Sequence, residues 1–220
     1  DAKVIKIGVF EPLTGDSGAG GKKEYLGMQY ANSQSPTVEI GGETYTIELV
    51  PSDNNSDQAK AVSAASNLVN ANVSLVLGSY GSGVSIAASE TFNDAGLAAI
   101  GVTCTNPGVT AGNDHYFRIC FLDPFQGTVL ANYAADLGAK KAYCLGELGN
   151  EYDQGLIAYF TQAFEAVTAK ALLFPTPSPK ITPTSPPISI KPRAKVRKCS
   201  SARYPSLMRP RSSARLLIWM

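Results

Sequence analysis

The sequence predicts an α/β protein in which a parallel sheet is flanked by helices. Short apolar runs rich in Val and Ile alternate with helix-like segments through residue 167. Two of those helix-like segments are closed by a glycine, at Gly96 and Gly138, and loops rich in Gly, Ser and Thr follow the apolar runs. Short buried strands that alternate with helices form parallel sheets through right-handed crossovers.

The first elements are read from their hydrophobic patterns. Residues 4–10 are apolar and β-branched and predict a strand, and a helix is expected at about residues 23–33. Residues 44–50 alternate polar and apolar side chains, as a half-exposed strand does. The next helix has Ser56 as candidate N-cap, with Asp57 favouring its N-terminus. Its expected apolar face consists of Ala61, Val62, Ala65, Leu68 and Val69.

The same alternation continues further along the chain. We expect strands at residues 73–78, 97–102, 116–122 and 142–146, and helices at 83–96, 123–137 and 152–167. In parallel sheets, ligands bind in the loops at the carboxyl ends of the strands. Three such loops, at residues 11–21, 78–85 and 101–108, are rich in Gly, Ser and Thr. Glycine lets the backbone approach a ligand, and hydroxyls and N–H groups at helix starts suit an anion such as a carboxylate.

Several motifs of other protein classes fail on inspection. Residues 16–23 lack the first Gly and the final Ser or Thr of a phosphate-binding loop, and no Gly-x-Ser-x-Gly is present. His115 is the only histidine, so a Zn site and a catalytic Ser–His pair are both disfavoured. Residues 53–64 lack the Gly and the Glu of a calcium-binding loop. The sequence predicts no catalytic residue, metal or cofactor.

The four cysteines, Cys104, Cys120, Cys144 and Cys199, show no CxxC spacing. Buried free thiols are favoured, because Cys120 and Cys144 lie in apolar, strand-like runs. One disulfide among the first three cysteines stays open.

The composition changes sharply near residue 167. All 18 acidic residues lie at or before Glu165, with 8 of the 19 basic ones, so the first 165 residues carry a formal charge of −10 and the rest carry +11. The last glycine is Gly155, while 9 of the 14 prolines lie between Pro175 and Pro210. We therefore expect residues 168–220 to be irregular or disordered. No apolar run is long enough to span a membrane, and a start at Asp1 suits a secreted chain after signal-peptide removal.

Five segments carry a resemblance to a known family, and they run in the family's order: IKIGVFEPLTG, IELVPSDNNSDQAKAVSAASNLV, VSLVLGSYGSGVSIAASETFNDAGLAAIGVTCTNPGVT, YFRICFLDPFQGTVLANYAADLGAKKAYCL and NEYDQGLIAYFTQAFE. Over residues 3–167 the chain resembles the type I periplasmic binding proteins of branched-chain amino acid ABC transporters. The resemblance implies two lobes that hold a ligand between them. It divides the chain into residues 1–121 of lobe one, residues 122–167 at the beginning of an incomplete lobe two, and a tail at residues 168–220 that is foreign to the family.

The resemblance also implies a site and partners. Ser82 matches the hydroxyl that meets the ligand carboxylate, Thr103 a backbone contact, Thr105 a hydroxyl and N–H contact, and Tyr152 an aromatic side chain at the lip of lobe two. Gly20 falls where some members place a tyrosine against the ligand side chain, and residues 101–105 read GVTCT instead of the familiar S-P-x-A-T. The implied ligand is a branched-chain or other aliphatic amino acid. The implied partner is an ABC permease, and the implied location is extracellular or periplasmic, compatible with a lipoprotein anchor before processing.

The tail suggests a reading-frame slip between roughly residues 166 and 174. Shifting the codons by one frame lets residues 183–188 encode Asp-Phe-Thr-Ser-Tyr and lets residues 194–209 encode KGAEVFFGPVSLAYA, both of which the family would offer there. A chain changed in this way would bind amino acids weakly or not at all. Its exposed apolar edges would also promote self-association. Two other classes are the alternatives: a small α/β hydrolase-like enzyme, and a nucleic-acid-binding protein that uses the basic tail. The shifted frame is a simpler origin for the clustered basic residues, so no nucleic-acid partner is expected.

Overall fold

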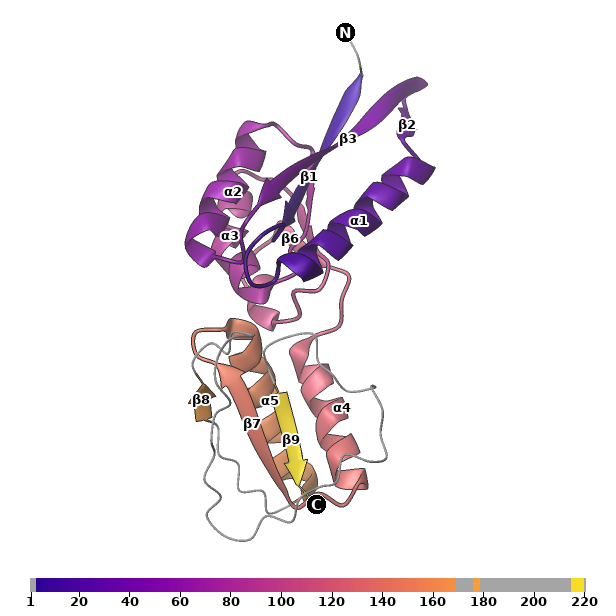
Figure 1. Ribbon diagram of the computed structural model, residues 1–220. Coiled ribbons are helices and arrows are strands. Elements are labelled where there is room, and N and C mark those ends of the chain that lie inside the picture. Colours follow the sequence, from indigo (N-terminus) through magenta and orange to yellow (C-terminus); the bar gives the residue numbers. More distant parts are fainter. Residues whose placement is uncertain (1–2, 169–175, 179–214, 220) are drawn as a thin grey trace.

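The computed structural model describes residues 3–168, 176–178 and 215–219. Figure 1 shows two lobes, one above the other, each with a sheet and its helices. The chain passes from the first lobe to the second once among residues 3–168, through residues 119–122. Within the described residues, no helix has the length and apolar character needed to cross a bilayer.

Lobe one contains a six-stranded sheet with the strand order β2-β3-β1-β4-β5-β6. Its elements, in chain order, are β1 (Val4–Glu11), α1 (Gly18–Gln34), β2 (Thr37–Ile40), β3 (Glu43–Asp53), α2 (Gln58–Asn70), β4 (Leu75–Leu77), α3 (Ser82–Asp94), β5 (Ala99–Gly101), a 3-10 turn at Pro107–Val109 and β6 (Tyr116–Arg118). All neighbouring strands pair in parallel except β2 and β3. The predicted α/β class with a parallel sheet is confirmed.

The antiparallel edge strand β2 was not predicted. All four of its residues are exposed, so it has no buried face to produce a hydrophobic pattern. Its hairpin with β3 turns at Gly41 and Gly42, which have φ values of 61° and 80°. Two consecutive positive φ angles are typical of the tight turns that match the twist of paired strands.

The main core lies between the sheet and helices α2 and α3 (Figure 1). Phe92 of α3 is its centre, with ring centroids 5.4 Å from Phe10 and 6.2 Å from Tyr116, both edge to face. Aromatic pairs of this geometry add about 0.5–1.5 kcal/mol beyond the area that they bury. The core thereby fixes the carboxyl end of β1 and the edge strand β6 against one helix.

The opposite face of the sheet is only partly covered, by α1. An open apolar groove of about 550 Å³ lies beside this helix. Its floor includes Ile7, Leu49, Leu77 and Ile100, and Met28 of α1 forms part of its wall. The sheet of lobe one therefore has one packed face and one face with accessible apolar side chains.

The N-cap of helix α2 lies one residue later than expected. The side chain of Asp57, not Ser56, caps it, by accepting from the N–H groups of Ala59 at 2.8 Å and Lys60 at 3.2 Å. Ser56 has a φ of 55°, and its hydroxyl oxygen instead accepts from Ser17 N at 2.9 Å. The buried face also differs from the expected one. Ala64 takes the place of Val62, which is exposed, and Val69 packs at the margin of the core.

Lobe two consists of α4 (Asp123–Asp136), β7 (Lys141–Glu147), α5 (Glu151–Thr168), β8 (Thr176–Ser178) and β9 (Arg215–Trp219). Its core forms where α4 and α5 pack on β7, and the rings of Phe160 and Phe164 stack there at 5.3 Å. The expected strand at residues 116–122 is shorter, because only Tyr116–Arg118 pairs with β5, and Phe121 and Leu122 lie exposed in the connection.

The expectation of an irregular tail is wrong for two short segments. β8 pairs with β7 in parallel and β9 pairs with it antiparallel. β8 and β9 thus pair with the main-chain N–H and C=O groups of β7, one along each side. Without them, these groups of β7 would have no strand partner. The remaining tail residues, 169–175, 179–214 and 220, lie outside the described residues.

Candidate ligand-binding site

Two loops meet at the edge of the sheet where the neighbouring parallel strands β4 and β5 end. Asn106, after β5, donates its backbone N–H to the Ser82 hydroxyl oxygen, 3.2 Å away, at the start of α3. The Thr103 hydroxyl lies 3.2 Å from the carbonyl oxygen of Tyr80. We call residues 78–82 and 101–106 the cradle loops. Ser82, Thr103 and Thr105 all lie in them, at one edge of the sheet.

Ser82 is the first residue of α3. The N-cap is Gly81, which has no side chain to satisfy the first N–H groups of the helix. Ser82 is 3% exposed, and its hydroxyl can still donate a hydrogen bond while it accepts one from Asn106. The start of α3 therefore presents N–H groups, a hydroxyl and the positive end of a helix dipole.

Thr105 is 5% exposed and lies beside Asp123, the first residue of α4. The backbone N–H of Asp123 donates to Thr105 O at 3.0 Å. The Thr105 hydroxyl lies within hydrogen-bonding reach of the Asp123 carboxyl group, and neither group has another hydrogen-bond partner among the described residues. Burial raises the pKa of Asp123, although the Thr105 hydroxyl and the Arg118 guanidinium oppose this shift. A buried hydroxyl and a buried carboxyl group that contact only each other keep further hydrogen-bonding capacity, so this pair is suited to a polar ligand group.

Thr103 is exposed and touches a carboxyl pair that the sequence did not reveal. Its hydroxyl lies 2.5 Å from Glu24 Oε1. Glu24, on α1, is near Glu11, which is fully buried at the end of β1 and accepts from Tyr80 N at 2.9 Å. Burial, reinforced by the Glu24 charge, raises the pKa of Glu11 to about 10. The sequence signal that could have revealed this pair was Glu11, an acidic residue that directly follows a buried apolar strand.

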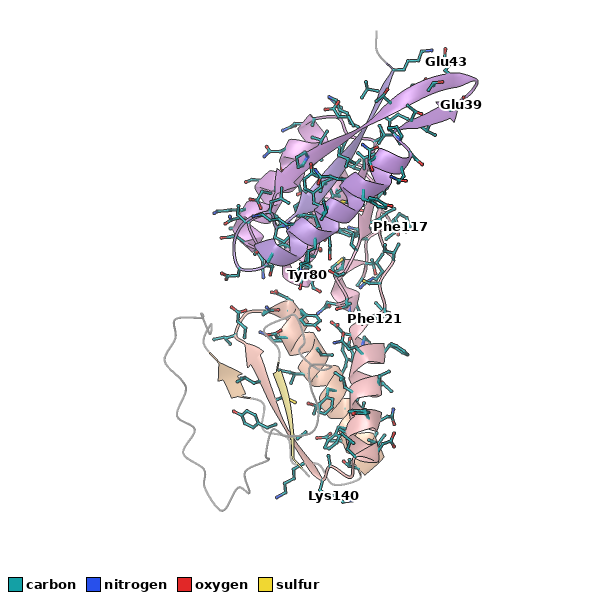
Figure 2. The ribbon with its side chains drawn as sticks, turned by 45° about the vertical axis from the view of Figure 1, so that its right-hand side comes forward. Glu39, Glu43, Tyr80, Phe117, Phe121 and Lys140 are labelled. Carbon is teal, nitrogen blue, oxygen red and sulfur yellow. The ribbon has the colours of Figure 1, made fainter. Side chains whose placement is uncertain are left out.

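An aromatic ring lies against Gly20. A Cβ atom at Gly20 would come within 2.5 Å of the Tyr80 ring, so only glycine leaves room for this packing. Tyr80 is half-buried, and Figure 2 shows it at the end of lobe one that faces lobe two. The aromatic side chain at this place thus comes from a cradle loop and not from α1.

The lobes touch through the first residue of α5. The Glu151 carboxylate accepts from Gln58 Nε2 at 2.8 Å, and its backbone oxygen accepts from Asn106 Nδ2 at 2.9 Å. Tyr152 is half-buried, and its hydroxyl accepts from Gln126 Nε2 at 3.0 Å, within lobe two. Tyr152 is therefore next to the contact between the lobes without bonding to lobe one through its hydroxyl. Sequence reasoning missed Gln58, Asn106 and Glu151.

Comparison with known proteins decides the family. A family model described as periplasmic binding protein matches residues 4–187. The chain belongs to the periplasmic binding protein family. The resemblance seen in the sequence is confirmed, and the match extends past the boundary expected at residue 167.

Similar proteins are longer than this periplasmic binding protein chain. It is 35% identical over 156 residues to an amino acid binding protein of Pseudomonas aeruginosa, across 69% of this chain and 41% of that protein. A Leu/Ile/Val-binding protein homolog of Brucella abortus is 34% identical over 133 residues, across 60% of this chain and 36% of the relative. The chain thus spans less than half the length of these relatives.

Solved structures show the same fold. A leucine binding protein of Thermotoga maritima superposes with a TM-score of 0.74 at 31% identity, over 80% of this chain and 49% of that one. A branched-chain amino acid transporter substrate binding protein of Streptococcus pneumoniae, solved with isoleucine, gives 0.70 at 31% identity, over 80% and 50%. The lobe architecture is therefore that of a type I periplasmic binding protein.

The hydrolase alternative loses support from the position of His115. The Nδ1 atom of His115 lies 3.0 Å from Asn93 Oδ1. His115 immediately precedes β6 and so lies at the amino ends of the parallel strands, whereas Ser82 lies at their carboxyl ends. A nucleophile and its base must lie within hydrogen-bond reach, and these two residues do not. Among residues 3–168, no three His, Cys, Asp or Glu side chains are grouped as a metal site requires.

Proposed function

We propose that this chain is part of an extracellular solute-binding receptor for an ABC importer, with its site in the cradle loops. The proposed ligand is a branched-chain or other aliphatic amino acid, and the proposed role is binding without catalysis. One observation carries the proposal: the start of α3, the Ser82 hydroxyl and the buried Thr105 hydroxyl lie together at the carboxyl edge of the sheet. Such a set of donors suits the ligand's carboxylate.

The side chain of the ligand requires an apolar surface. Gly20 leaves open the place where some family members have a tyrosine, and the Tyr80 ring packs over it. We assign to Tyr80 the aromatic wall against which an aliphatic side chain rests. Thr103 acts through its contacts with Glu24 and Tyr80, and Tyr152 closes the site from lobe two. Relatives named for leucine, isoleucine and valine support this ligand class.

The proposed domain division follows the two lobes. Residues 1–121 form lobe one, residues 122–167 begin lobe two, and residues 168–220 arise from a shifted reading frame. The proposed partner is an ABC permease, and the proposed location is extracellular or periplasmic. Sequencing the coding DNA between residues 160 and 190 tests the frame slip. A shifted frame that encodes the family's pattern is expected, and a gene without one would remove this part of the proposal.

Affinity in this chain is expected to be low. A site that is closed from both sides excludes water from the charged ligand, and the chain spans about half the length of related binding proteins. We expect a dissociation constant for leucine on the order of millimolar or weaker, since less of the ligand is enclosed. Isothermal titration that gave micromolar affinity would contradict this expectation.

Binding at the cradle loops is tested by NMR titration. Leucine at millimolar concentration should shift the amide signals of residues 78–82 and 101–106, and leucinamide, which lacks the carboxylate, should shift them much less. Ser82→Ala should reduce the leucine response, and Ser89→Ala, seven residues further along the same helix, should leave it unchanged. A leucine response that survives Ser82→Ala, or that appears only outside residues 78–82 and 101–106, would rule out this site.

A further inference from the structure

Two carboxyl groups from distant parts of the chain meet beneath the cradle loops. Glu11 ends β1 and is fully buried, and Glu24 lies on α1 at the wall of the apolar groove. Each has one oxygen, Glu11 Oε1 and Glu24 Oε2, that no donor among the described residues satisfies. The two side chains are within hydrogen-bonding reach of one another. Two carboxyl groups in contact can bond only when a proton lies between them.

The other oxygen of each carboxyl group binds a cradle loop. Glu11 Oε2 accepts the backbone N–H of Tyr80 at 2.9 Å, and Glu24 Oε1 lies 2.5 Å from the Thr103 hydroxyl. The network therefore runs from the loop after β4, through both carboxyl groups, to the loop after β5. The Thr103 hydroxyl, 3.2 Å from Tyr80 O, closes it into a ring.

The surroundings decide which member carries the proton. Burial first, and then the Glu24 charge, raise the pKa of Glu11 to about 10. Burial also raises the pKa of Glu24, but bonds from Thr103 and Glu11 lower it. Near neutral pH, Glu11 is therefore the acid that donates, and Glu24 is the carboxylate that accepts from two hydroxyl groups. Tyr116 of β6 and Cys120 of the connection lie within electrostatic reach, and burial raises the pKa of both, so neither is charged.

We infer that Glu11 and Glu24 hold one proton between them and act as positioning residues, which fix both cradle loops in the arrangement that receives the ligand's carboxylate. The inference rests on the proposed function for its purpose, but the network itself can be tested without a ligand. The positions of Tyr80 and Thr103 then depend on two residues, Glu11 and Glu24, that do not touch the ligand.

Substitution by glutamine distinguishes the two members. In Glu11→Gln the amide group donates to Glu24 while its oxygen accepts from Tyr80 N, as the protonated acid does. In Glu24→Gln the amide oxygen must accept from Glu11, so the amide N–H₂ group faces Thr103. The Thr103 hydroxyl must then accept where it donated, which replaces a hydrogen bond to a carboxylate by a neutral one. The inference therefore predicts unequal effects, whereas two buried side chains that only fill space would tolerate glutamine equally.

The readout is hydrogen exchange of the Tyr80 amide, measured by NMR on the full chain without ligand. We expect Glu11→Gln to leave its rate nearly unchanged and Glu24→Gln to increase it by about five- to tenfold, the effect of exchanging one hydrogen bond to a carboxylate for a neutral one. The ¹³C shift of the Glu11 carboxyl group should be that of a protonated acid at neutral pH. Glu90→Gln, an exposed glutamate of α3, serves as the control and should change neither signal.

Thr103→Val gives a second measurement if Glu24→Gln does not fold, because Thr103 is exposed. This substitution removes one donor to Glu24 and should increase the exchange rate of the Tyr80 amide severalfold. Thr103→Ser keeps the hydroxyl and should retain the wild-type rate. An ionised Glu11 carboxyl group, or equal exchange rates in both glutamine variants, would overturn the inference. Loss of the leucine response with an intact network would instead count against the proposed function alone.

Discussion

Glu11 follows Phe10 at the end of β1, and its burial makes the charged form of its carboxyl group costly. A folded-state pKa of about 10, against an ordinary value of 4.5, means that folding binds a proton between these two pH values. Stability from this group is complete below about pH 4.5 and is lost as the pH rises toward 10. The carboxyl group is thus neutral near pH 7.

The pH dependence of stability follows from this shift. We expect the free energy of unfolding to fall as the pH rises from 5 to 9, by at most about 1.4 kcal/mol per pH unit. Glu11→Gln cannot ionise at this position, so its stability should depend less on pH. Urea unfolding at several pH values measures both slopes, with Glu90→Gln as the control. Parallel curves for the wild-type chain and Glu11→Gln would show that Glu11 does not titrate in this way.

The order in which the cysteine thiols react is a second prediction at the residue scale. Cys104, Cys120 and Cys144 are free, so the disulfide left open by the sequence does not form among them. Burial raises the pKa of Cys104 and of Cys144 to about 11, while Cys120 is only half-buried. Because the thiolate is the reactive form, iodoacetamide should modify Cys120 first among these three cysteines in the folded chain. Peptide mass spectrometry measures the order, and in urea the three rates should converge. Rapid native labelling of Cys104 would contradict its burial.

At the scale of elements, the start of α2 depends on one side chain. The Asp57 carboxylate accepts two of the N–H groups that a helix N-terminus leaves unpaired. We expect Asp57→Ala to lower the free energy of unfolding by about 1 kcal/mol, and Asp57→Asn to retain most of the stability, because its amide oxygen can also accept. Urea unfolding measures both. Equal losses in the two variants would indicate that charge, and not capping, is the contribution.

Elements with a buried face were the predictable ones. β1 and β3 stand out because their apolar residues form runs or alternate, and the end of α3 near Gly96 was also expected. β2 was missed because none of its side chains is buried. α1 starts at Gly18, before the expected residue 23. Its true start was not predictable, because its first residues, Gly-Ala-Gly-Gly, have no apolar periodicity.

The candidate site was predictable to a similar degree. The topology of a parallel sheet brought Ser82 and Thr105 to one edge, as expected from loops that follow neighbouring strands. The Glu11–Glu24 pair and the Asn106–Glu151 contact were not predictable, since they depend on how α1 and α5 pack. A hydrogen bond between residues 45 positions apart leaves no trace in local sequence patterns.

At the scale of the whole molecule, the uneven covering of lobe one is the main feature. Helices α2 and α3 cover one face of its sheet, while the α1 face keeps an open apolar groove. Near that groove, Phe117, Ile119, Phe121 and Phe125 are each more than half exposed along β6, the connection and α4. Figure 2 shows Phe117 and Phe121 on the same side of the molecule. Exposed apolar groups of this extent are typical of surfaces that another protein covers.

This surface predicts self-association of the chain. β6 is an edge strand, so a second copy could cover both its open hydrogen-bonding side and the apolar side chains beside it. We expect light scattering coupled to size-exclusion chromatography to show species larger than 23.2 kDa. The double substitution Phe117→Lys and Ile119→Lys should shift the population toward the monomer. Val62→Lys, an exposed apolar position on α2, is the control and should not do so.

The salt dependence of self-association distinguishes association through the apolar surface from association driven by charge. The acidic lobes, with a formal charge of −10 over the first 165 residues, could also attract the basic tail of another copy. Such ionic association weakens as salt screens the charges, with a Debye length that falls from about 10 Å at 0.1 M to about 3 Å at 1 M. Apolar association persists and is strengthened by sulfate. Dissociation in high salt, together with no effect of the lysine substitutions, would attribute the association to the tail and leave the exposed face of lobe one without a role in it.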